Sequence, residues 1–218
     1  MFSTPNSLKK RTGKADLDRY TYLKELLEEY KSTGEEDKKE QVIANLGNFA
    51  YDPINYEYFR RLDINEVFLE NLINFKRNNN FNLKILHFSI AALCNLCFDP
   101  KNREYLVKHN FVNLVLNCLA IEPTIDQIEL ILNVFTILIF MTDTSNEPEE
   151  IDSSELDRIK TEIHCPTWLN KYKYIALYEN KISIFQNIKL SLKSKIFYKQ
   201  SYGSEAILLD LSLERSQT

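Results

Sequence analysis

The residues best suited to chemistry in this 218-residue chain are its four cysteines and three histidines. Cys94 and Cys97 form a C-x-x-C motif, but no second C-x-x-C or paired histidine follows at the spacing of a zinc site. The surrounding pattern is that of a helix interior, which favours reduced thiols that pack as small apolar residues. His87, His109 and His164 lie far apart in the sequence.

The sequence also lacks the motifs that mark common catalytic sites. It contains no glycine-rich phosphate loop, no G-x-S-x-G nucleophile elbow and no H-E-x-x-H pair. We therefore expect no enzyme activity, no cofactor, no metal and no small-molecule substrate.

An asparagine that recurs near the ends of two predicted helices is better suited to binding than to catalysis. Asn48 and Asn95 lie 47 residues apart in matching sequence surroundings. A side-chain amide both donates and accepts, so it can bind the N–H and the C=O of an extended chain at once. The alternative is that both amides cap or bridge neighbouring helices inside the protein.

Helices must position these residues. The chain has only four Gly and six Pro, which favours long helices joined by short loops. Apolar residues three or four apart predict helices over 16–33, 37–51, 55–62, 65–75, 83–98 and 128–141.

The predicted helices repeat with a shift of 47 residues. A period in the forties is typical of armadillo and HEAT arrays. A third block keeps the apolar helix over 128–141 but loses the polar residues. We expect Asp52 and Asp99, which precede prolines, to begin a turn or cap the next short helix. The shift aligns Leu46 with Leu93, Asn48 with Asn95, Asp52-Pro53 with Asp99-Pro100, and Glu57-Tyr58 with Glu104-Tyr105.

The Leu-x-Asn pattern at the close of two long predicted helices, Leu46-Gly47-Asn48 and Leu93-Cys94-Asn95, resembles the signature of the third helix of an armadillo repeat. The resemblance is strong over 37–119 and faint after 141. It implies an all-α fold, an armadillo-like right-handed α-solenoid of about three to four helical repeats. We place this domain at 16–200, with an acidic loop at 144–157, a flexible basic N-terminus at 1–15 and a flexible tail at 201–218.

Polar and aromatic residues around Asn48 form the predicted binding surface. A helical wheel places Gln41, Asn45 and Asn48 on a stripe away from Leu46. Tyrosine and arginine are frequent anchors of interfaces, which favours Tyr56 and Arg60, whereas Tyr58 is better explained as core between repeats. The predicted partner-binding residues are Gln41, Asn45, Asn48, Tyr51, Asn55, Tyr56, Arg60, Asn95 and Asn102.

The resemblance also implies a function. Similar proteins are non-enzymatic adaptors that bind an RNA-binding protein with an RNA-recognition motif in pre-mRNA splicing, particularly in the minor spliceosome. Other spliceosomal proteins are then expected partners, and RNA is contacted mainly through the RNA-binding protein. The net charge of −4 fits a basic protein surface better than direct nucleic-acid binding.

The sequence predicts an intracellular protein that contacts no membrane. No apolar run follows the first basic residues, and the apolar stretch 130–141 is too short to span a bilayer. Lys9-Lys10-Arg11 could act as a nuclear import signal, although such triplets are common. We expect a nuclear location, with a cytoplasmic one also open.

Two alternative functions remain. A lysine-rich C-terminal half could contact RNA phosphates directly, or could instead be a solvated helix face. The chain could also be a transport or signalling adaptor that binds linear peptides. The predicted RNA contacts are Lys189, Lys193, Lys195 and Lys199.

Overall fold

The computed structural model describes residues 18–78, 80–121 and 127–142, together with Thr4, Ser154, Asp157 and Thr161. Its contacts divide the chain into two compact units, Met1–Phe140 and Met141–Thr218. The helices discussed here belong to the first unit, except for the last two residues of α9. The predicted tail, most of the acidic loop and all four predicted RNA-contacting lysines lie outside the described residues.

All regular structure in the described ranges is helical, so the predicted all-α class is confirmed. None of these helices combines the length and the apolar character that crossing a bilayer requires. The elements are α2 (Arg19–Ser32), α3 (Glu36–Ala50), the 3₁₀ turn η1 (Pro53–Asn55), α4 (Tyr56–Arg61), α5 (Ile64–Arg77), α6 (Leu83–Leu96), α7 (Pro100–Lys108), α8 (Phe111–Asn117), the 3₁₀ turn η2 (Cys118–Ala120) and α9 (Ile128–Thr142).

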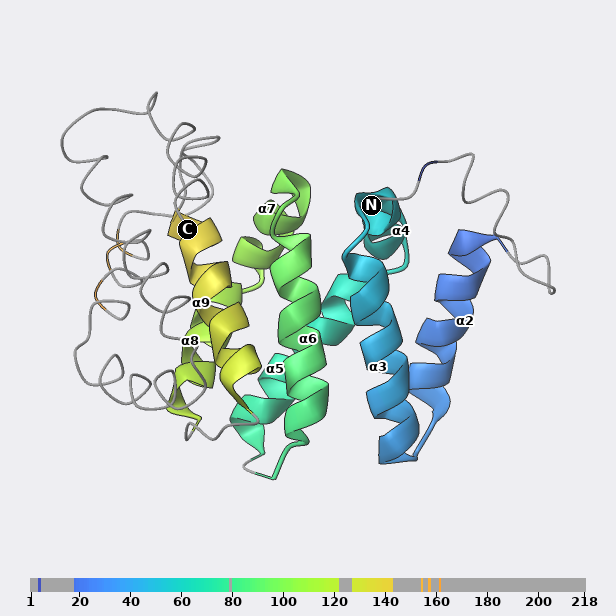
Figure 1. Cartoon of the computed structure of the whole chain (residues 1–218), viewed down its shortest axis with the longest axis horizontal. Coiled ribbons are helices and arrows are strands. Elements are labelled where there is room, and N and C mark those ends of the chain that lie inside the picture. Colours follow the sequence, from blue (N-terminus) through green and yellow to red (C-terminus); the bar gives the residue numbers. More distant parts are fainter. Residues whose placement is uncertain are drawn as a thin grey trace, which may run out of the picture. The chain divides into compact units, whose positions relative to one another are not determined.

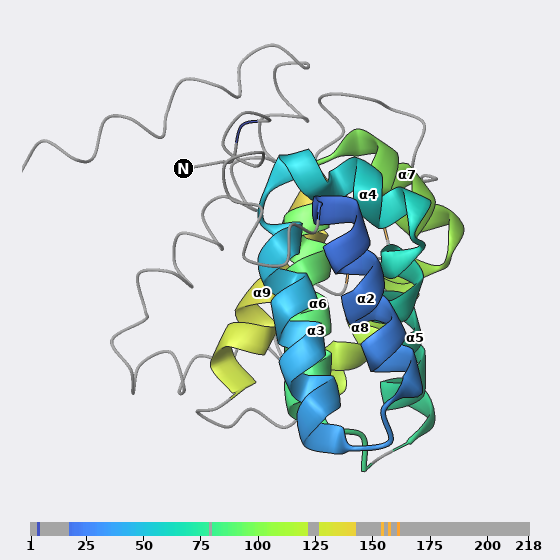
Figure 2. The same cartoon turned by 90° about the vertical axis from the view of Figure 1, so that its right-hand side faces the viewer.

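The helices of the first unit form a stack of repeats. Helices α3, α6 and α9 lie in one layer, α2, α5 and α8 lie in a second, and α4 and α7 cross one end (Figures 1 and 2). A pair, α2–α3, precedes two triplets, η1/α4–α5–α6 and α7–α8–α9. The 47-residue shift places η1 and α4 together on α7, which confirms the repeat predicted from the sequence.

Short polar residues start the helices at matching positions in the two triplets. The Asp52 carboxylate accepts the N–H of Ile54, and the Asp99 carboxylate accepts the N–H of Asn102. The predicted capping role of these aspartates is therefore confirmed. Asp63 and Asn110, also 47 residues apart, precede α5 and α8 in the left-handed region, with φ of 54° and 59°. Asp and Asn tolerate this conformation better than other residues with a Cβ.

The α3–α6 contact is close because a glycine lies in it. A Cβ on Gly47 would be 3.4 Å from the Phe88 carbonyl oxygen and 3.8 Å from the Ala92 Cβ. Leu46 and Leu93 are fully buried beside this contact. Burial of these side chains supplies the hydrophobic free energy that holds one repeat against the next.

The C-x-x-C motif lies at the end of α6. Cys94 and Cys97 are buried and form no disulfide with a described cysteine, and burial raises the pKa of Cys94 to about 12. A thiol with so high a pKa carries almost no thiolate at neutral pH, so it is a poor nucleophile. No group of three or more metal-ligating side chains occurs among the described residues.

Candidate protein-binding surface

The two repeated asparagines occupy the same position on neighbouring helices. Asn48 lies on α3 and is exposed, and Asn95 lies on α6 and is half-buried. Each follows a fully buried leucine by two residues, which turns its side chain about 200° around the helix from that leucine. The two residues therefore hold equivalent positions of the repeat on α3 and α6, which stack side by side (Figure 1).

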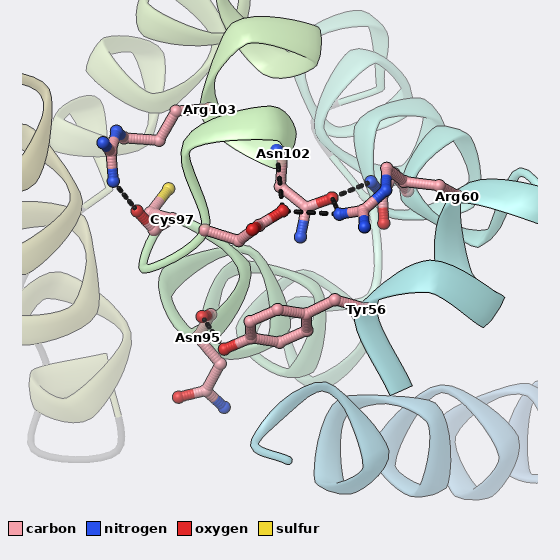
Figure 3. A network of polar contacts seen from close by, with 8 residues as sticks. Tyr56, Arg60, Asn95, Cys97, Asn102 and Arg103 are labelled. Atoms are coloured by element: carbon pink, nitrogen blue, oxygen red, sulfur yellow. Dashed lines mark hydrogen bonds and ion pairs between the residues drawn. The ribbon is translucent and has the colours of Figure 1, made fainter. Parts of the chain in front are cut away.

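The side-chain amides of Asn48 and Asn95 make no hydrogen bond with other described residues. Only the main-chain carbonyl of Asn95 is engaged across the repeats, where it accepts the Tyr56 hydroxyl at 3.0 Å. Figure 3 shows the Asn95 amide directed away from that contact. Among the described residues, the arrangement favours amides available to a partner over amides that bridge helices.

Three further predicted residues extend this surface along α3. Gln41 is exposed, Asn45 is half-buried, and Tyr51, at the end of the helix, is 57% exposed. The α3–α6 surface is defined here as Gln41, Asn45, Asn48, Tyr51 and Asn95. It offers amide donors and acceptors together with one aromatic ring, the chemistry that suits a peptide or protein partner.

Four predicted partner-binding residues instead lie in the contact between the repeats. Asn55 and Asn102 are 1% and 0% exposed, and Tyr56 is 8% exposed. Arg60 is 30% exposed and forms an ion pair with Asp99. Asn55 and Asn102 are too buried to contact a partner, which corrects the prediction from the sequence for these two residues. Tyr56 and Arg60 make contacts inside the protein with Asn95, Asp99 and Asn102, so they are not part of the α3–α6 surface.

The repeats are joined by a network of polar contacts around Asn102 (Figure 3). The Arg60 guanidinium donates to the Asp99 carboxylate and also to the side-chain oxygen Oδ1 of Asn102, at 3.0 Å. The Asn65 amide donates to the same oxygen at 3.3 Å. This network fixes α7 of one triplet against α4 and α5 of the triplet before it.

The Tyr56 hydroxyl, which lies in this contact between the repeats, is kept neutral. Burial, with the charges of Asp99 and Asp52 adding to it, raises the pKa of Tyr56. The hydroxyl therefore stays a hydrogen-bond donor to Asn95, and its role is to position the end of α6. Tyr58, which the sequence assigned to the core, is half-buried and meets the Tyr20 ring edge-on at 6.1 Å.

The sequence patterns did not single out an exposed aromatic residue in the turn between α6 and α7. Phe98 is 61% exposed and lies 47 residues after Tyr51. Its ring meets the Phe140 ring edge-on at 4.6 Å. The repeat shift, applied to Tyr51, was the signal that could have found it.

The chain is similar to armadillo repeat-containing protein 7 of the mouse, Mus musculus, with 43% identity over 76 residues. The matched region covers 35% of this chain and 35% of the relative, so the chain matches about a third of the curated relative's length. No model of a known protein family matches the chain. The similarity and the stacked helical repeats together support the resemblance to the armadillo-repeat family that the sequence indicates.

Proposed function

We propose that this chain is a non-enzymatic, repeat-based adaptor that binds a partner protein on the α3–α6 surface. The observation that carries the proposal is the matched pair of amides, Asn48 and Asn95, on neighbouring helices and without hydrogen bonds to other described residues. Polar side chains that stay open at repeated positions suit the main chain of a partner, because each can pair with one N–H and one C=O.

The partner that we propose is an RNA-binding protein with an RNA-recognition motif, acting in pre-mRNA splicing and in the minor spliceosome. The resemblance to armadillo-repeat proteins supports this choice, and the net charge of −4 suits a basic partner. The same resemblance leads us to propose a nuclear location for the chain. RNA would then be contacted through the partner.

The test compares partner capture by the full chain and by a double variant, Asn48→Ala with Asn95→Ala. Asn74→Ala is the matched control, because Asn74 is an exposed asparagine on α5, in the other layer. Tagged chains are expressed in cells, and co-purified proteins are quantified by mass spectrometry. Thermal melting of each purified chain is measured in parallel.

We expect the double variant to capture at least about tenfold less of the RNA-recognition-motif protein than the unmodified chain does. Its melting temperature should stay the same, since both changes remove exposed or half-exposed amides. A lowered melting temperature with unchanged capture would contradict the proposal and support bridging amides. A salt titration with a purified RNA oligonucleotide tests the alternative. Tight binding that weakens steeply with salt would indicate direct RNA contact.

A further inference from the structure

A hollow of about 560 Å³ lies beside the contact between the two triplets. One wall comes from the α3–α4 turn and from α4, including Pro53, Ile54 and Glu57. The other comes from the α6–α7 turn, including Phe98 and Pro100. A space of this volume accommodates one or two amino-acid side chains.

The apolar side chains of this hollow are exposed to solvent. Phe98 is 61% exposed, and Pro53 and Pro100 are exposed on the two facing turns. The Phe98 ring is nevertheless held in place by its edge-on contact with Phe140. An exposed ring that a neighbouring ring fixes in place offers a rigid apolar contact that costs little conformational entropy on binding.

The charged groups of the hollow favour a basic ligand. Arg60, the only arginine among the described residues of its walls, is already engaged by Asp99 and Asn102. Glu57 is exposed and makes no ion pair with another described residue. Among the described lining residues, Glu57 is therefore an acidic group open to a ligand, and no cation is open to one.

We propose that this hollow docks a short extended segment of the partner protein in which an apolar side chain adjoins a lysine or arginine. The apolar side chain packs on Phe98 between the two prolines, and the basic side chain pairs with Glu57. The hollow is separate from the amides of Asn48 and Asn95. The inference rests on the proposed function because the ligand is part of the bound protein.

The pattern of charges also sets this ligand apart from a nucleic acid. A phosphate backbone needs cations, and the carboxylate of Glu57 would repel it. Base stacking on Phe98 alone would leave that repulsion in place. Binding of a single-stranded RNA at Phe98 would consequently overturn the proposal.

The experiment measures binding of immobilised heptapeptides to the purified full chain. The peptides share a Ser-Gly framework, with a central Leu or Phe followed by Arg, Lys, Glu or Ser. The variants are Phe98→Ala and Glu57→Lys, both at exposed positions that substitution should not unfold. Tyr22→Ala and Glu25→Lys are the matched controls, an exposed aromatic and an exposed acid on α2.

We expect the wild-type chain to retain the Arg and Lys peptides at least about tenfold more than the Glu peptides. Phe98→Ala should abolish retention of all of them, and Glu57→Lys should reverse the preference for a basic neighbour. Equal retention by the wild-type chain and both variants would overturn the proposal, as would RNA binding that Phe98→Ala abolishes.

This test is independent of the adaptor test. Asn48→Ala with Asn95→Ala should leave peptide retention unchanged, because neither residue lines the hollow. If partner capture needs the two amides but the peptides do not need Phe98, the hollow fails as a docking site and the adaptor function stands. If peptides bind but capture ignores the amides, the adaptor surface has been misplaced.

Discussion

The turn between α3 and α4 and the turn between α6 and α7 share three polar or proline positions at the same spacing, yet their asparagines make different contacts. Each has an Asp-Pro pair and a buried asparagine, Asn55 in the first and Asn102 in the second. The Asn55 amide donates to the Phe49 carbonyl at 2.8 Å, within its own turn. The Asn102 side chain instead accepts from Arg60 and Asn65, which belong to the preceding triplet.

The two donors to Asn102 come from the preceding triplet, Arg60 on α4 and Asn65 on α5. The same shift of 47 residues applied to the surroundings of Asn55 gives Gly13 and Asp18, which carry neither a guanidinium nor a side-chain amide. The second turn consequently gains an ion pair and two hydrogen bonds from its neighbour. A repeated motif can therefore serve as a local cap in one copy and as a joint between repeats in the next.

The largest effect should come from removing the two buried asparagines one at a time. Asn102→Ala leaves the Asn65 amide without its acceptor and weakens the hold on Arg60, so it should cost about 3 kcal/mol of unfolding free energy. Asn55→Ala should cost about 1 kcal/mol of unfolding free energy, because the Phe49 carbonyl oxygen still accepts a hydrogen bond from the N–H of Asp52 at 3.2 Å. Urea unfolding followed by circular dichroism measures both. Equal losses would mean that the two turns are equivalent after all.

A smaller effect should come from the ion pair that distinguishes the second turn. A double-mutant cycle with Arg60→Ala and Asp99→Asn should give a coupling energy of about 1 kcal/mol, since both side chains are largely buried and share Asn102. The exposed pair Lys24 and Glu28 is the control and should couple by less than about 0.5 kcal/mol. A coupling at Arg60 no larger than the control value would remove the ion pair from the joint.

The smallest effect concerns pH, and it compares another pair of positions 47 residues apart, Glu40 and His87. Hydrogen bonds from Asn82 and Lys84 lower the pKa of Glu40 below 4.5, whereas burial lowers the pKa of His87 below 6.5, against an opposing effect of Glu129. In both cases the unfolded state takes up a proton first as the pH falls. Stability should therefore decline once below pH 6.5 and again below pH 4.5.

Unfolding midpoints measured from pH 8 to pH 3 separate the two steps. His87→Gln should remove the decline that begins near pH 6.5 and keep the lower one. Glu40→Gln should reduce the lower decline, to which the lowered pKa values of Asp18 and Glu104 also contribute, and keep the upper one. If His87→Gln left the first decline in place, another group would have to be responsible for it.

The helices and their 47-residue period could be predicted from the sequence because both depend on local apolar spacing, as at Leu46 and Leu93. The burial of Asn55 and Asn102 could not, since a helical wheel counts an asparagine as polar and hence exposed. The buried Asn102 accepts a hydrogen bond from Arg60, 42 residues earlier in the chain, and that pairing exists only once the repeats have stacked. Phe98 was missed for the opposite reason, because an apolar ring is expected to be inside the protein.

The most direct test of the account is hydrogen exchange of the full chain with and without an excess of the captured partner protein. The account predicts slower exchange of amides in the second half of α3 and along α6, with little change on α2 and in the middle of α5. Protection confined to α2 and α5, with α3 and α6 unchanged, would contradict the assignment of the binding surface to Asn48 and Asn95.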